Sequence, residues 1–153
     1  MLGEFVAQQM SGLTQERDCS MPSVNLHLAD LMKALKSCVI GIGYVRCGGQ
    51  LERALLYKVL ADRAGLPCSL HRTCSAHAWC EVAVPELGPN EEFNENENYP
   101  AGLLRANYVV DLMEHPGKLL PRKSPEARRV CGGECSPYIT REKHTECDCG
   151  IGK

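Results

Sequence analysis

The sequence predicts one α/β domain of the α+β kind, in which helices pack against a small antiparallel sheet. Residues 50–64 are rich in leucine and alanine and end at Gly65, with Pro67 behind it, which is typical of a capped helix. Residues 77–84 divide into two faces at a period of two, and residues 108–113 form a short apolar run. A central helix followed by strands that cover it predicts the mixed class.

The size and charge of the chain exclude several function classes. Its 153 residues fit a single domain that buries about 68–70% of its unfolded surface. The formal net charge of -2 argues against nucleic-acid binding, which usually needs a basic face. Apolar runs stop far short of the roughly 20 residues that span a bilayer. We therefore expect neither a nucleic acid nor a membrane as partner.

The ten cysteines raise the alternative of a disulfide-rich secreted protein. The N-terminus has neither a basic region nor a long apolar run, so no signal peptide is predicted. Cys38, Cys68 and Cys80 lie inside apolar runs, where a free cysteine behaves as a small hydrophobe. The distribution predicts free thiols in a reducing, cytoplasmic setting.

The first third of the chain predicts two helices and an extended segment. A short amphipathic helix ends before Ser11, and a second helix begins near Pro22. Its predicted buried stripe has steps of four, three and four: Val24, Leu28, Leu31 and Leu35. Residues 38–45 are apolar and broken by glycines, which predicts an irregular strand or an extended approach to the core helix.

The middle of the chain predicts the core. The helix from Gln50 to Ala64 should be central, and its predicted inward residues are Leu51, Ala54, Leu55, Val59 and Leu60. A short strand over residues 67–72 and a second over 77–84 follow. The second strand should place on one face His77, Trp79 and Glu81, and on the other Ala78, Cys80, Val82 and Val84.

The last part of the chain loses its apolar pattern. Residues 85–106 are acidic and predict an exposed excursion, after which residues 108–113 form a strand that residues 115–117 end. Beyond Pro121 the composition becomes basic and polar. The sequence therefore predicts a domain over residues 1–128 and a Cys-rich, loosely ordered tail over residues 129–153.

Two motifs carry a family resemblance over roughly residues 1–128. Residues 53–62 (Arg-Ala-Leu-Leu-Tyr-Lys-Val-Leu-Ala-Asp) with 65–68 form the first, and residues 108–113 (Tyr-Val-Val-Asp-Leu-Met) with 116–121 form the second. They resemble the peptidase-like module shared by plant ethylene-response-type kinases and an animal armadillo-repeat protein. His77-Ala78-Trp79 is similar to the histidine strand of the wider transglutaminase-like, papain-related group. The lack of a kinase signature favours the animal branch.

The resemblance implies a papain-like or transglutaminase-like core and a set of site residues. In the wider group the helix opens with a cysteine four residues before the alanine of the first motif, and here Gln50 stands at that position. The implied vestigial triad is Gln50, His77 and Asp111, in a cleft that Trp79 also lines. An amide is no nucleophile, so the favoured hypothesis is a non-catalytic module for protein–protein interaction.

The resemblance leaves further alternatives open. The chain is a fragment or isoform of a longer armadillo-repeat protein, or a purely structural piece of an armadillo-repeat, ciliary or sperm assembly, or a diverged single-domain relative. The implied localisation is cytoplasmic, and the cilium or sperm flagellum is compatible with it. No cofactor is implied.

An active thiol peptidase or acyl transferase is the alternative, with Cys47 as nucleophile, His77 as base and Asp111 as orienting acid. The adjacent helix N-terminus would lower the thiol pKa of Cys47. However, three extended residues separate Cys47 from Gln50, about 10 Å, whereas a nucleophile must lie within about 3 Å of its base. Asp111 is expected to need a partner because a buried unpaired carboxylate is costly, and His77 is the family's candidate.

The tail offers a metal alternative. Its candidate ligands are Cys131, Cys135, His144, Cys147 and Cys149. Structural zinc sites usually separate paired cysteines by two to four residues, and the single residue between the last two cysteines does not fit this spacing. The sequence therefore predicts no metal site.

Overall fold

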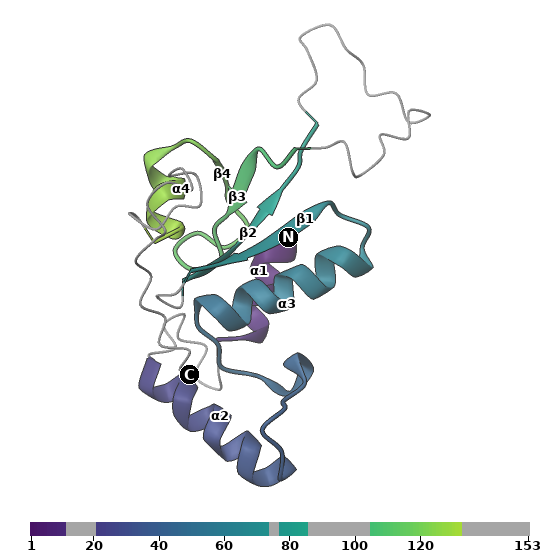
Figure 1. Ribbon diagram of the computed structural model, residues 1–153, viewed down its shortest axis with the longest axis vertical. Helices are drawn as coiled ribbons and strands as arrows, with labels where there is room; N and C mark the ends of the chain where they lie inside the picture. The colour runs from purple at the N-terminus through teal and green to yellow at the C-terminus, as the bar shows by residue number, and fades with distance from the viewer. Residues whose placement is uncertain (12–20, 74–76, 86–104, 133–153) are drawn as a thin grey trace, which may run out of the picture.

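The computed structural model describes residues 1–11, 21–73, 77–85 and 105–132 (Figure 1). The helical elements are α1 (Leu2–Gln9), α2 (Met21–Leu35), the 3₁₀ turn η1 (Ile42–Tyr44), α3 (Gln50–Arg63) and α4 (Pro125–Val130). The strands are β1 (Cys68–Arg72), β2 (Ala78–Val82), β3 (Tyr108–Val110) and β4 (Leu119–Pro121). They form one antiparallel sheet in the order β1-β2-β3-β4, which confirms the predicted α+β class.

Helix α3 lies on one face of the sheet, as expected for the central helix. The N–H of Gly49 donates to Glu52 Oε2 at 2.8 Å, which closes the first turn. Gly65, at φ +71°, follows the helix end in the left-handed region, as predicted. The buried stripe is Arg53, Ala54, Tyr57 and Ala61.

The prediction that Leu55 and Val59 of α3 face inward is wrong. Leu55 is 37% exposed and Val59 is 39% exposed. A single sheet covers only one side of the helix, and Ala54, Tyr57 and Ala61 already occupy that side at helical spacing. The apolar surface of α3 is therefore wider than the area that the sheet can cover.

The alternation in β2 is confirmed, and both of its faces are buried. Ala78, Cys80 and Val82 pack in the cluster beneath α3. Trp79 packs on the opposite face, in a second cluster completed by Val109, Leu120, Ala127 and Cys131. Helix α4 covers this second face, so the sheet has a helix on each side (Figure 1).

Helix α4 and strand β4 were not predicted. Ser124 is the N-cap of α4, and its Oγ accepts from the Ala127 N–H at 3.1 Å. The predicted domain boundary at residue 128 falls inside this helix, and Cys131 beyond it is only 2% exposed. Residues 133–153 of the predicted tail lie outside the described residues.

The two N-terminal predictions hold in part. Helix α2 forms, but of its predicted stripe only Val24 is fully buried, and Leu35 is 40% exposed because α2 extends away from the sheet (Figure 1). Residues 38–41 form no strand and lead into η1, so the irregular strand is wrong and the extended approach is correct. Of the cysteines that were predicted to lie in apolar surroundings, Cys38 is exposed, whereas Cys80 is 0% exposed. Among the described helices, none combines the length and apolar character needed to cross a bilayer.

Two contacts fix α3 and α1 to the end of β3. The guanidinium of Arg53, 1% exposed, donates through Nε to the Gly48 carbonyl at 3.1 Å and through Nη1 to the Leu112 carbonyl at 2.9 Å. In α1, a Cβ added at Gly3 would lie 2.5 Å from the Gly117 backbone, so only glycine permits this approach. The turn after β3 is therefore held from two sides.

Candidate functional site

The centre of the site is a side-chain pair formed by Gln50 and His77. Gln50 is the first residue of α3, and His77 immediately precedes β2. Gln50 Oε1 lies 3.1 Å from His77 Nδ1, and Gln50 Nε2 donates to the Val130 carbonyl at 2.7 Å. That carbonyl is one of the last in α4, where no intrahelical partner is available. Both ends of the Gln50 amide are therefore engaged.

A cavity of about 300 Å³, here called the cleft, opens beside this pair. The turn of residues 111–118 forms one wall and α4 forms another. The cleft is lined by Gln50, His77, Asp111, Met113, Glu114, His115, Lys118, Leu120, Glu126, Arg129 and Val130. The structure thus brings together the three vestigial triad positions and surrounds them with charges of both signs.

Trp79 does not line the cleft, contrary to expectation. Its ring is 1% exposed, and its Nε1 donates to Glu81 Oε1 at 3.1 Å. The His71 ring stacks on it at 5.5 Å between centroids, from the neighbouring strand. Because the indole N–H finds its partner inside the protein, Trp79 contributes to the core under α4 and not to ligand contact.

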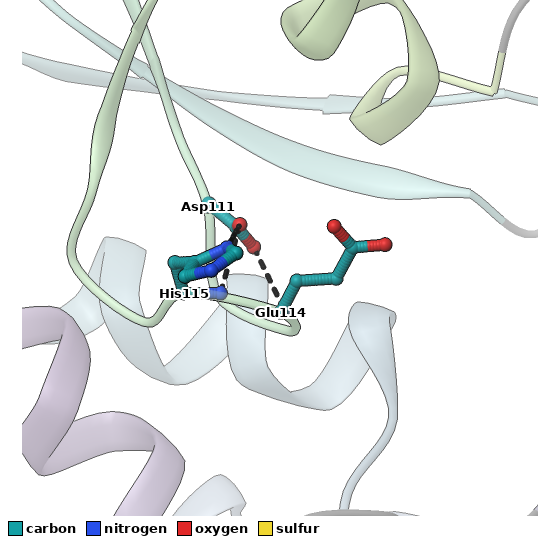
Figure 2. A group of neighbouring side chains, drawn as sticks. All are labelled: Asp111, Glu114 and His115. Atoms are coloured by element: carbon teal, nitrogen blue, oxygen red, sulfur yellow. Dashed lines mark hydrogen bonds and ion pairs between the residues drawn. The ribbon is translucent and has the colours of Figure 1, made fainter.

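The expected His77–Asp111 pairing is absent, although both residues lie in the described part of the chain. The Asp111 carboxylate accepts from the turn that follows it: Oδ1 from the Met113 and Glu114 N–H groups at 2.8 and 3.1 Å, and Oδ2 from the His115 N–H at 2.9 Å. Figure 2 shows the His115 ring beside this carboxylate, with Nδ1 at 3.8 Å. The buried Asp111 thus finds its partners locally, and His77 pairs with Gln50 instead.

Asp111, Glu114 and His115 also offer metal-ligand atoms that all lie within 4.8 Å of one another (Figure 2). Three protein ligands are the number that a catalytic zinc site uses. However, both oxygens of Asp111 already accept backbone hydrogen bonds, and Glu114 and His115 are exposed. This arrangement is explained as a hydrogen-bonded turn. Of the tail residues weighed as ligands, Cys135, His144, Cys147 and Cys149 lie outside the described part.

Cys47 is anchored away from His77. It forms an isolated antiparallel bridge with Ser11, and the next N–H, of Gly48, donates to the Met10 carbonyl at 3.2 Å. Cys47 is not among the residues that line the cleft, and Nδ1 of His77 lies against Gln50 instead. A Cβ at Gly48 would lie 2.7 Å from Met10 Sδ, so this segment is closely packed on the end of α1. Such anchoring opposes the backbone swing that a Cys47 nucleophile requires.

The sequence predicted a loosely ordered tail at Cys131 and Gly132, but the structure places Cys131 in the core beneath α4 and Gly132 next to His77 of the cleft. Cys131 is buried, and burial, followed by the charge of Glu81, raises its pKa to about 12, so its thiol stays protonated at neutral pH. Gly132 packs its backbone against the His77 ring. A glycine directly after a short capped helix is a C-cap signal that the sequence does contain, but the polar surroundings obscured it.

Replacing Gly132 with alanine should lower the free energy of unfolding by about 1–2 kcal/mol, because its φ of +85° is unfavourable for a side chain. The added Cβ would also lie 3.0 Å from His77 Cγ and Cδ2. Urea unfolding followed by Trp79 fluorescence measures the change. Gly65→Ala is the matched control, because Gly65 also has a positive φ, of +71°, but no atom lies within 4 Å of its added Cβ. Equal effects of the two variants would contradict the contact with His77.

The similarity of the chain to known proteins covers the same domain. Residues 1–120 match the family described as EDR1/CTR1/ARMC3, peptidase-like. The chain is 41% identical over 128 residues to armadillo repeat-containing protein 3 of Homo sapiens, covering 82% of this chain and 14% of that protein. It is 30% identical over 95 residues to the probable serine/threonine-protein kinase SIS8 of Arabidopsis thaliana, covering 60% of this chain and 8% of that protein.

No solved structure matches the chain significantly. The chain spans only a small part of either relative, so the comparison identifies a module and not a whole protein. The family match covers most of the chain and includes the Gln50, His77 and Asp111 positions. The chain therefore belongs to the EDR1/CTR1/ARMC3 peptidase-like family.

Proposed function

We propose that this chain is a non-catalytic peptidase-like module that binds a protein partner in the cleft between α4 and the turn of residues 111–118. The observation that carries the proposal is the Gln50 side chain, which occupies the position where the resemblance to the wider group implies a thiol. Its Oε1 lies 3.1 Å from His77 Nδ1 and its Nε2 donates to Val130. Covalent catalysis needs a nucleophile at hydrogen-bond distance from its base, and an amide cannot act as one.

The charged rim of the cleft supports a protein partner. Glu114, Lys118, Glu126 and Arg129 line it and are exposed, so they remain available for contact. Protein interfaces combine a desolvated centre with a polar rim, and arginine is enriched among their anchor residues. The half-buried His77 and the buried Leu120 form the deeper part of the same cavity.

An Arg129→Glu substitution should weaken partner binding about tenfold, equivalent to about 1.4 kcal/mol, because it reverses a charge at the cleft. The matched control is Arg63→Glu at the end of α3, which makes the same charge change at an exposed position outside the cleft. Tagged wild-type chain and both variants are incubated with cell extract, and captured partners are quantified by mass spectrometry. We expect a partner that Arg63→Glu retains and Arg129→Glu loses.

Two results would overturn this function. Identical partner sets for all three chains would favour a structural role in a larger assembly, such as that of an armadillo-repeat protein. Rapid acylation of Cys47 by a thiol-directed acyl probe, abolished by His77→Ala, would favour the active peptidase or acyl transferase. A cytoplasmic setting is proposed with the binding role, because Cys38, Cys68, Cys80 and Cys131 are free thiols in the described residues.

A further inference from the structure

Two cysteines lie side by side on the sheet face beneath α3. Cys68 begins β1 and Cys80 is in the middle of β2. The register pairs Cys68 with Val82 and Leu70 with Cys80, so the two cysteines are diagonal neighbours on one face. Both contact the same apolar cluster. This pair shares no residue with the lining of the cleft.

The two thiols differ in access. Cys80 is 0% exposed, and its Sγ donates to the Ala54 carbonyl at 3.3 Å. Cys68 is half-buried and lines a separate cavity of about 400 Å³ together with Asp62, Ser69 and Glu81. A small oxidant can therefore reach Cys68 from this cavity while the sheet and α3 enclose Cys80.

The surroundings also separate the two thiols electrostatically. Interaction with the neighbouring Cys80 side chain, then the charge of Lys58, lowers the pKa of Cys68, against the opposing effect of its partial burial. The Lys58 ammonium is fixed nearby because its Nζ donates to the Cys68 carbonyl at 2.8 Å. The same interaction and burial raise the pKa of Cys80. One thiol is thus disposed to be the nucleophile and the other to hold its proton.

We propose that Cys68 is an oxidative modification site for hydroperoxides and that Cys80 is its resolving cysteine. The Cys68 thiolate attacks a peroxide oxygen, the O–O bond breaks, and Cys68 becomes a sulfenic acid. The Cys80 sulfur then attacks the Cys68 sulfur, the S–O bond breaks, and water leaves with the Cys80 proton. Two thiols lose two electrons in total, and the hydroperoxide is reduced to an alcohol, or water, plus water.

The position of β1 makes the resulting disulfide feasible. A disulfide requires the two Cβ atoms to approach to about 3.8 Å, closer than diagonal neighbours usually lie. β1 is the edge strand of the sheet and pairs only with β2. Local movement of β1 that brings the two sulfurs together therefore breaks ladder hydrogen bonds on one side only.

The test treats the full chain with hydrogen peroxide, blocks the remaining thiols by alkylation and maps the peptides by mass spectrometry. Wild type should form a Cys68–Cys80 disulfide before the exposed Cys38 is oxidised. Cys80→Ser should instead accumulate a sulfenic acid at Cys68 that dimedone traps, and Cys68→Ser should leave Cys80 unmodified. In the untreated wild type, iodoacetamide should label Cys68 about threefold faster than Cys38 at neutral pH.

The proposal fails if Cys38 is oxidised before Cys68 or if Cys68 bonds to a cysteine other than Cys80. It also fails if Cys80→Ser shows no dimedone adduct at Cys68. The iodoacetamide comparison uses the unaltered chain, so it decides the first step even if a serine variant does not fold. None of these outcomes depends on the cleft or on its partner.

Discussion

Replacing Asp111 with alanine should lower the free energy of unfolding by about 3 kcal/mol. Three backbone N–H groups, of Met113, Glu114 and His115, donate to its carboxylate. Each hydrogen bond contributes about 1 kcal/mol net, and bonds to a charged acceptor contribute more. Urea denaturation measures the loss, because the single tryptophan, Trp79, lies in the cluster beneath α4 and reports unfolding of the sheet.

Two controls sharpen this prediction. Asp111→Asn keeps one acceptor oxygen for Met113 and Glu114 but faces the His115 N–H with an amide group, so an intermediate loss of about 1–2 kcal/mol is expected. Asp62→Ala removes a carboxylate of similar size that pairs with Lys58 at the surface, and such pairs contribute about 0–1 kcal/mol. If Asp111→Ala costs no more than Asp62→Ala, the turn does not depend on this carboxylate.

Replacing Gln50 with cysteine should create a reactive thiol at the position where the natural chain has an amide. The new thiol stands at the first position of α3, where the helix dipole favours an anion, and it faces the His77 ring. Free cysteine titrates near pH 8.5, whereas thiols at helix N-termini or beside histidine titrate at about 3.5–7.5. The pH dependence of alkylation at residue 50 should therefore have its midpoint at about pH 7 or below.

The contribution of His77 is separable from that of the helix. In cysteine, two bonds separate Cα from the reactive atom, whereas four bonds separate Cα from Oε1 in Gln50. The new sulfur therefore points toward the His77 ring but lies farther from it than Oε1 of Gln50 does. Adding His77→Ala to Gln50→Cys should move the midpoint upward, and Cys38 provides an exposed reference thiol in the same molecule. A midpoint near pH 8.5 in Gln50→Cys would show that this position no longer activates a thiol.

The sequence predicted those parts of the fold that depend on local signals. The length of α3, its end at Gly65 and the two faces of β2 follow from short-range periodicity and one left-handed glycine. The meeting of Gln50 and His77 followed from motif positions, because the family resemblance placed both at the same site. These predictions needed no knowledge of what packs against the sheet from outside.

Other features depend on contacts that a local pattern does not reveal. Helix α4 has only six residues, and its burial depends on the surface formed by Trp79 and Leu120. The free-energy cost of burying a charge shows that the Asp111 carboxylate needs partners, but it does not identify them. His77 was expected because the family resemblance suggested it. The sequence could have predicted the hydrogen bonds within the turn, because aspartate often accepts from backbone N–H groups two or more residues later in the chain.

The contact between Gly3 and Gly117 has a consequence for the order in which the chain folds. Helix α1 packs on α3 and also on the turn at Gly117, so only part of its packing surface exists before that turn forms. Formation of this contact closes a loop of more than a hundred residues, and contacts of such long range slow folding. Helix α1 can therefore meet α3 before the Gly3–Gly117 contact closes.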